Sequence, residues 1–306
     1  MADTAAEIFG KKLKNPLVLA SGILGVSKKS LENVADHGAG ALTTKSLSLE
    51  PRRGHDTPIF IETSGGALNA VGYSNPGIEK GLDEFSGWDR DEPLIISITG
   101  KSPAEFGELA ARIEKKDGLG AAAIEAAISC PHTPEYGLLA GQGTPESVSE
   151  IVAAVRKNTT LPVIIKLSPS VPREVEQAKA AEKAGAAAIN MGNSLGPGMI
   201  IDIERKRPVL SFGRGGLSGP AIKPVSVRCV YDIYKAVGIP IIGTGGVTNG
   251  KDAVEMIMAG AQLVGVGTAV YYRGPEAFSQ IDAEMREWME ERGYRRTYEI
   301  LGAAHE

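Results

Sequence analysis

Cys130 is the residue of this sequence best placed for acid–base chemistry. It closely follows the apolar run Ala121–Ile128 and precedes the segment Pro131–Gly143, which contains three glycines. A free cysteine has a pKa of about 8.5, so a modest shift makes it a useful general base around neutral pH. The other cysteine, Cys229, lies in the helical pattern SVRCVYDIYKAV and is expected to be buried and inert.

Two lysines lie at the ends of apolar runs, where a charged side chain is unusual. Lys45 follows Gly40–Thr44, and Lys166 lies near the end of Pro162–Leu167. Most lysines are solvated surface residues. Spacing alone therefore leaves open the alternative that Lys45 and Lys166 are surface residues too. A fixed cation beside a reduced flavin stabilises the negative charge near its N1–C2=O edge. These lysines therefore make a flavin a candidate ligand.

Three glycine-rich segments indicate a phosphate site. They are Gly243–Val247, Gly265–Ala269 and Gly215–Pro220. Glycine lets backbone N–H groups approach an anion closely, and a helix N-terminus adds partial positive charge. Ordinary turns are the alternative for any single glycine pair, but three such segments favour a phosphorylated ligand or cofactor.

The elements that must position these residues are short apolar runs, each followed by a longer amphipathic stretch. The runs are continuous rather than alternating, which is typical of parallel strands buried on both faces. The predicted strands are Pro16–Ala20, Gly40–Thr44, Pro93–Ile98, Ala121–Ile128, Pro162–Leu167, Ala186–Asn190, Pro240–Gly243 and Leu263–Gly267. Helical patterns between them include Pro103–Lys115, Pro145–Lys157, Pro172–Ala184, Pro220–Val237, Lys251–Ala259 and Pro275–Glu291. The α/β pattern predicts one domain over residues 1–306, a (β/α)₈ TIM barrel.

Two connections, at residues 46–75 and 192–218, exceed ordinary βα loops. Loops of this length are uncommon unless they are functional. Both follow predicted strands, so they are expected as long loops on the C-terminal face, where barrel enzymes carry out their chemistry. A doubly wound sheet is the alternative fold, but no second domain is evident to complete it.

Composition excludes several functional classes. The net charge is −4 with both signs well mixed, which argues against a nucleic-acid partner. No apolar run is long enough for a membrane span or a signal peptide, so a cytoplasmic location is expected. There is no CxxC pair and there are only two cysteines, so neither a metal site nor a disulfide framework is predicted.

Several segments resemble motifs of the class 1 dihydroorotate dehydrogenases. Residues 43–77, TTKSLSLEPRRGHDTPIFIETSGGALNAVGYSNPG, are similar to that family's lysine-containing strand end, PRxGN and LNxxGLxNPG motifs. The form NPG is similar to the subclass that works with a flavin and iron–sulfur subunit, and residues 129–148 also resemble the flavin domain of dihydropyrimidine dehydrogenase. Further similar segments are Ala20–Gly22, Ile128–Pro131, Lys166–Pro169 and Gly215–Pro224.

This resemblance implies an FMN enzyme that oxidises dihydroorotate to orotate in pyrimidine biosynthesis. It implies that Cys130 is the general base while hydride passes from the adjacent carbon to flavin N5, with Lys45 also catalytic. Positions matching the contacts of the isoalloxazine and ribityl groups are Ala20, Lys45, Ser46 and Lys166. Positions matching the FMN phosphate contacts are Gly219, Thr244, Gly245, Gly246, Gly267 and Thr268. Positions matching the substrate contacts are Asn69, Asn193 and Ser194 for the pyrimidine, with the backbone of Val71 and Gly72 for its carboxylate.

The sequence departs from the family pattern at several positions, of which three bear on the proposed site. Ala127 and His132 stand where asparagines are usual, and Tyr73 replaces a leucine. The asparagine replaced by Ala127 is expected to contact both flavin and pyrimidine, and a lost partner for a buried polar group costs about 1–3 kcal/mol. Ala127 therefore supports an alternative, the same FMN chemistry on a different cyclic amide or activated alkene.

Two further alternatives remain, a flavin-binding subunit with an assembly role and a flavin-free phosphate-binding barrel such as an aldolase or isomerase. No GxGxxG fingerprint between an early strand and a helix indicates NAD binding by this chain. Electrons are therefore expected to leave through an FAD/iron–sulfur partner subunit or to a small oxidant. A homodimer is expected from the family.

Overall fold

Eight parallel strands close into a barrel at the centre of the computed structural model, which describes residues 2–128, 137, 142–171 and 173–306. Around the barrel the strands follow chain order, and all eight coincide with predicted strands, so the predicted (β/α)₈ barrel is confirmed. The barrel strands are β3 (Leu17–Leu19), β4 (Ala41–Thr43), β7 (Leu94–Ile98), β8 (Ala121–Ala127), β9 (Val163–Leu167), β10 (Ala188–Met191), β15 (Ile241–Thr244) and β16 (Leu263–Val266).

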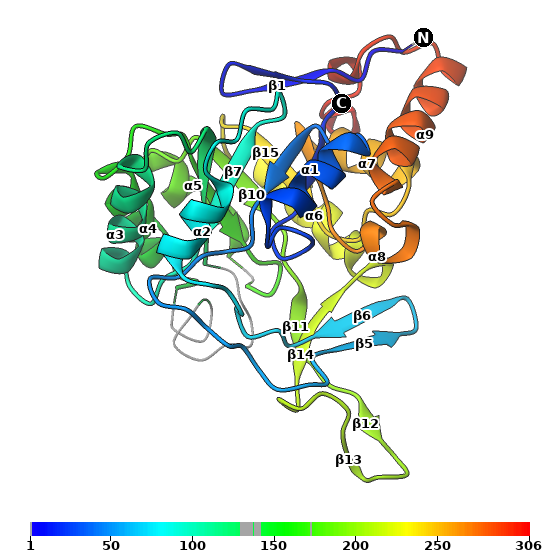
Figure 1. Cartoon of the computed structure of the whole chain (residues 1–306). Helices are drawn as coiled ribbons and strands as arrows, with labels where there is room; N and C mark the ends of the chain where they lie inside the picture. The colour runs from blue at the N-terminus through cyan, green and yellow to red at the C-terminus, as the bar shows by residue number, and fades with distance from the viewer. Residues whose placement is uncertain (1, 129–136, 138–141, 172) are drawn as a thin grey trace.

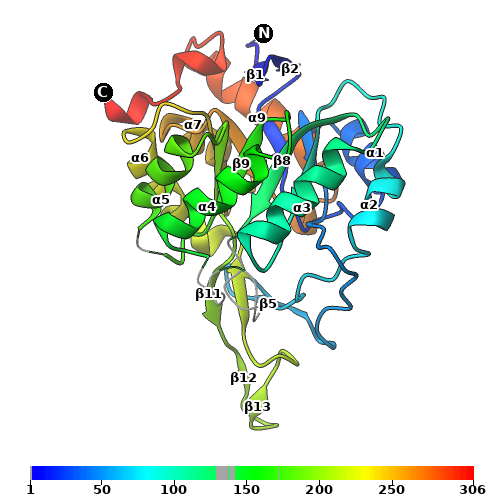
Figure 2. The ribbon, with the colours of Figure 1, turned by 90° about the vertical axis from the view of Figure 1, so that its left-hand side faces the viewer.

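Helices surround the barrel (Figures 1 and 2). The main hydrophobic core combines buried side chains of the barrel strands with those of the helices. Side chains of Ser27, Ser102, Thr144 and Asn249 cap the N-termini of α1, α3, α4 and α7. The helices are α1 (Lys28–Asp36), α2 (Ile78–Phe85), α3 (Pro103–Glu114), α4 (Pro145–Arg156), α5 (Glu174–Lys183), α6 (Lys223–Tyr234), α7 (Gly250–Met258), α8 (Ala269–Arg273) and α9 (Ala277–Glu291), with short 3₁₀ helices η2 (Pro220–Ile222), η3 (Thr297–Glu299) and η4 (Ala303–His305). Among the described residues, no helix has the length and apolar character needed to cross a bilayer.

The two long connections are not plain loops, because they fold together into a four-stranded antiparallel sheet at the C-terminal end of the barrel. One connection supplies β5 (Phe60–Thr63) and β6 (Gly66–Asn69), and the other supplies β11 (Leu195–Gly198) and β14 (Gly215–Ser218). A small hairpin of β12 (Ile201–Asp202) and β13 (Arg207–Pro208) projects beyond this sheet (Figure 1). The connections thus form one wall over the barrel mouth.

A second hairpin, β1 (Ala6–Ile8) and β2 (Lys11–Leu13), covers the opposite end of the barrel (Figure 1). Its buried Ile8 and Leu13 join a separate apolar cluster with residues at the start of the barrel strands, including Val18 and Ile164. The barrel is therefore closed by apolar packing at its N-terminal end.

Candidate active site

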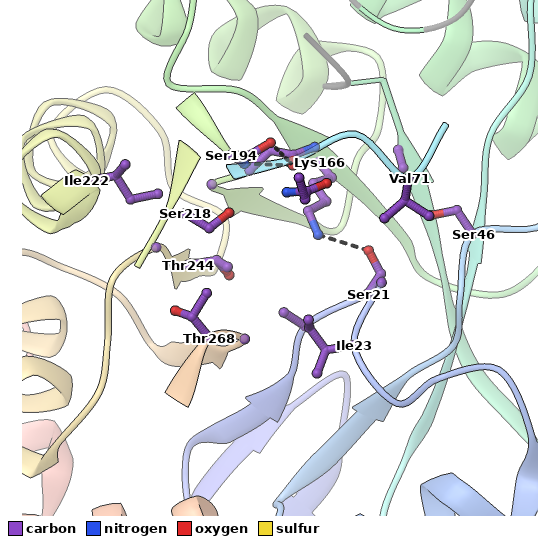
Figure 3. A pocket seen from close by; sticks show the side chains of 18 of the residues that line it. Ser21, Ile23, Ser46, Val71, Lys166, Ser194, Ser218, Ile222, Thr244 and Thr268 are labelled. Carbon is purple, nitrogen blue, oxygen red and sulfur yellow. Dashed lines mark hydrogen bonds between the residues drawn. The ribbon is translucent and has the colours of Figure 1, made fainter. Parts of the chain in front are cut away.

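A pocket of about 300 Å³ opens at the C-terminal end of the barrel. Barrel strand ends form its floor, and the antiparallel sheet contributes its wall (Figure 3). Every residue predicted to bind the cofactor or the substrate lines this pocket, namely Ala20, Lys45, Ser46, Asn69, Val71, Gly72, Lys166, Asn193, Ser194, Gly219, Thr244, Gly245, Gly246, Gly267 and Thr268. Their individual roles remain predictions.

The predicted base, Cys130, lies outside the described residues, as does His132. Ala127, the last residue of β8, lines the pocket three positions earlier in the chain. Of the remaining segment, Gln142 is buried, accepts a hydrogen bond from the Gly137 N–H (2.9 Å) and donates to the Gly100 carbonyl (2.8 Å). Its side chain therefore ties the described part of this segment to the loop after β7.

Glycine stands after β15 and after β16 for two different structural reasons. Gly246 has a φ of +77°, and a Cβ there would lie 2.6 Å from the Cβ of Lys223, so the backbone packs closely against the start of α6. Among the described residues, by contrast, a Cβ at Gly267 would meet only the Cβ of Ala20, at 3.8 Å. Gly267 therefore leaves space at the pocket surface rather than avoiding a clash within the chain.

Among the described residues that line the pocket, the charged ones are Lys45 and Lys166. Lys166 is almost fully buried, and its Nζ donates a hydrogen bond to Ser21 Oγ at 2.9 Å (Figure 3). Lys45 Nζ lies 5.8 Å from the centre of the Tyr73 ring, within the range of a cation–π contact. Two cations in one pocket favour a ligand that carries or develops negative charge.

A carboxylate behind the pocket partners one of these lysines. Glu125, on β8, is 1% exposed, and its Oε1 lies 3.8 Å from Lys166 Nζ. The same oxygen accepts a hydrogen bond from Ser97 Oγ (2.9 Å), and Oε2 accepts one from Asn190 Nδ2 (2.6 Å). No role was predicted from the sequence for these three residues, although each is a polar side chain within an apolar strand, which is an unusual position.

The loop predicted to hold the substrate is braced by residues from both long connections. A Cβ at Gly72, where φ is +73°, would lie 2.9 Å from the ring of His55. His55 Nδ1 lies 3.1 Å from the Ala70 carbonyl, and its ring stacks on Phe212 with centroids 3.9 Å apart. His55 and Phe212 therefore fix the backbone around Val71, and neither was predicted from the sequence.

The remaining cysteine behaves as predicted. Cys229 is fully buried on α6, and burial raises the pKa of its thiol to about 12. A thiol in this state is protonated at neutral pH and is a poor nucleophile.

Comparison with known proteins connects this geometry to one family. The family described as Dihydroorotate dehydrogenase matches residues 4–289. The dihydroorotate dehydrogenase B (NAD(+)) catalytic subunit of Methanothermobacter thermautotrophicus is 46% identical over 296 residues, which covers 96% of each chain. The protein of the same name from Pyrococcus abyssi is 44% identical over 297 residues, covering 97% of each. A crystal structure of DHODH from Eimeria tenella in complex with ferulenol has a TM-score of 0.83 at 20% identity, covers 99% of this chain and 89% of that one, and supports the fold alone.

Proposed function

The chain belongs to the dihydroorotate dehydrogenase family, and we propose that it is the catalytic subunit of a cytoplasmic FMN enzyme that oxidises dihydroorotate to orotate. The observation that carries the proposal is the single pocket that joins two lysines, a glycine-lined end and the Asn69–Tyr73 loop. In this proposal residues 1–306 act as one catalytic domain in pyrimidine biosynthesis.

The pocket fits FMN on two counts. Its volume of about 300 Å³ lies within the range of small-molecule sites. Open space at Gly267, beside Gly245, Gly246, Thr244 and Thr268, suits a phosphate group. Bound there, FMN supplies a two-electron acceptor. Residues proposed to hold it are Ala20, Lys45, Ser46, Lys166, Gly219, Thr244, Gly245, Gly246, Gly267 and Thr268.

Oxidation of dihydroorotate removes a proton from one ring carbon and a hydride from its neighbour. We propose that Cys130 takes the proton, because a cysteine titrates near the working pH. The lysines Lys45 and Lys166 stabilise the negative charge that develops in the pocket. Residues proposed to hold the substrate are Asn69, Val71, Gly72, Asn193 and Ser194.

The proposal includes two protein partners. The relatives are named as catalytic subunits that use NAD(+), and this sequence lacks a dinucleotide fingerprint in the expected position. We therefore propose that electrons leave through a separate FAD/iron–sulfur subunit. A homodimer is proposed from the resemblance to the family.

The direct test is orotate formation from dihydroorotate with an artificial electron acceptor. The wild-type chain is expected to form orotate, and Cys130→Ser is expected to retain flavin but lose at least about a hundredfold in kcat, the usual scale of general-base catalysis. Product formation at an unchanged rate in Cys130→Ser would remove Cys130 from the mechanism. A flavin-containing wild-type protein that forms no orotate would contradict the proposed reaction.

Ala127 favours one alternative, in which the same FMN site accepts another cyclic amide or an activated alkene. Both Ala127 and Tyr73 line the pocket, so both departures from the family pattern alter its wall. Orotate titrated against the oxidised protein separates the two candidates. If dihydroorotate is the substrate, orotate perturbs the flavin spectrum, and Ala127→Asn tightens its binding about tenfold to a hundredfold. Absence of orotate binding in both proteins would favour the alternative.

A further inference from the structure

Among the described residues, Glu125 is the most completely buried carboxylate near the pocket, and the structure assigns it a role. We propose that Glu125 is a positioning residue of the flavin site. It offsets the charge of Lys166, and it sets the direction in which the Ser46 and Thr244 hydroxyls donate their hydrogen bonds. This inference rests on the proposed binding of FMN. Glu125 does not line the pocket and acts only through its neighbours.

The charge balance follows from burial. Lys166 is 4% exposed and Glu125 is 1% exposed, so each charge is largely removed from water. A buried charge persists when it is paired and its remaining hydrogen-bonding capacity is used. Ser97 and Asn190 each donate a hydrogen bond to Glu125, and Lys166 donates one to Ser21. Glu125 therefore offsets part of the positive charge that Lys166 brings to the pocket.

The direction of these hydrogen bonds follows from the fact that a carboxylate can only accept. Because Glu125 only accepts, Ser97 Oγ must donate to it, and Ser46 Oγ must then donate to Ser97 Oγ at 2.9 Å. On the other side, Asn190 Nδ2 donates to Glu125, which leaves Asn190 Oδ1 to accept from Thr244 Oγ1 at 2.8 Å. The Ser46 and Thr244 hydroxyls thus direct their protons into the protein and away from the pocket. Their oxygens are left as acceptors toward the ligand.

This arrangement predicts an effect on the redox properties of the bound cofactor. Loss of the Glu125 charge leaves the Lys166 cation less compensated, which favours the reduced, more negative form. Glutamine at this position is close in size, and its amide nitrogen can donate to Ser97 while its oxygen accepts from Asn190. Ser97 can then donate to Ser46, so the Ser46 proton is freed to point into the pocket.

The experiment measures the midpoint potential of FMN bound to the wild-type chain, Glu125→Gln, Glu125→Asp and Glu150→Gln. Glu150→Gln makes the same charge change at an exposed position on α4. Glu125→Gln is expected to shift the oxidised–reduced equilibrium at least tenfold toward the reduced form, about 30 mV for a two-electron couple. Glu125→Asp is expected to stay closer to wild type, and Glu150→Gln to match it.

A flavin-loaded Glu125→Gln with the wild-type potential would overturn the inference, and so would equal shifts in Glu125→Gln and Glu150→Gln. If Glu125→Gln fails to fold, Glu125→Gln/Lys166→Gln decides the matter. It removes both charges, so it is expected to fold if the defect is the uncompensated Lys166. If the double variant is as unfolded as Glu125→Gln, the proposed pairing of Glu125 with Lys166 is contradicted. A wild-type chain without FMN would overturn the proposed function and this inference together.

Discussion

At the scale of single residues, two glycines of one strand end serve different purposes. A Cβ at Gly265 would lie 1.9 Å from Thr244 Oγ1, a clash inside the barrel. A Cβ at Gly267 would meet one atom of the part of the chain that the structure describes, 3.8 Å away, and this residue lines the pocket. The first glycine is therefore required by packing, and the second by whatever occupies the pocket.

Gly267→Ala is therefore expected to fold normally and to bind FMN more weakly. An added methyl group in a well-packed contact costs about 1–3 kcal/mol, which corresponds to roughly five- to 150-fold in affinity. Titration of the apoprotein with FMN measures the loss, and thermal unfolding checks the fold. Gly265→Ala is the matched comparison and should lower thermal stability instead. Unchanged FMN affinity in Gly267→Ala would contradict a ligand at that position.

The pocket residues were largely predictable from sequence because most lie in short motifs at strand ends. Glu125 was not, because a lone carboxylate within an apolar strand does not reveal which neighbouring strand supplies its partners. Those partners come from β7 and β10 and from Lys166 on β9, and they become adjacent only when the barrel closes. Cys130 was predicted from sequence but lies outside the described residues, so its role stays a prediction.

At the scale of elements, continuous apolar runs predicted all eight barrel strands, since strands buried on both faces need no polar alternation. The antiparallel sheet over the pocket was missed. Its strands are short and rich in glycine, and β14 pairs with β6 nearly 150 positions earlier in the chain, Gly216 opposite Asn69. Pairing at that separation leaves no local pattern.

Asp252 joins three elements behind the predicted phosphate site. Its Oδ1 pairs with Lys223 Nζ of α6 at 2.7 Å, and its Oδ2 accepts from the Thr248 N–H and hydroxyl, each at 2.9 Å. Burial acts to raise the pKa of Asp252, but the hydrogen bonds from Lys223 and Thr248 outweigh it and lower the pKa overall. The ionised carboxylate therefore stabilises the loop after β15.

Asp252→Asn is expected to lower the free energy of unfolding at pH 7 by about 1–3 kcal/mol. Because the folded pKa of Asp252 lies below its unfolded value of about 3.9, the ionised form stabilises the protein above that value. That contribution is lost as the pH falls through the folded pKa. Urea unfolding of both proteins at neutral and acidic pH measures the difference. If Asp252→Asn lowers the free energy of unfolding by the same amount at pH 7 and at about pH 3, ionisation of Asp252 is not the cause of the loss.

At the scale of the whole molecule, stability and chemistry are assigned to opposite ends of the barrel. The β1–β2 hairpin packs Ile8 and Leu13 against the first residues of the barrel strands. The pocket lies at the other end, where the antiparallel sheet contributes its wall. This division is typical of TIM-barrel proteins and lets the two ends be changed independently.

Leu13→Ala tests this division. Leu13 is 2% exposed, so truncation is expected to cost about 2–5 kcal/mol of unfolding free energy. FMN content and kcat, measured well below the unfolding temperature, should match wild type. The exposed neighbour Lys12 provides a control, because Lys12→Ala should change stability by no more than about 0.5 kcal/mol. A large fall in kcat for folded Leu13→Ala would show that the two ends are coupled.

The central claim is that the pocket holds FMN and passes the electrons of dihydroorotate to it. Anaerobic mixing of the FMN-loaded chain with dihydroorotate, followed at the visible absorption band of the oxidised flavin, tests that claim most directly. The band is expected to bleach as orotate appears in equal amount. A band that dithionite bleaches but dihydroorotate leaves unchanged would contradict it.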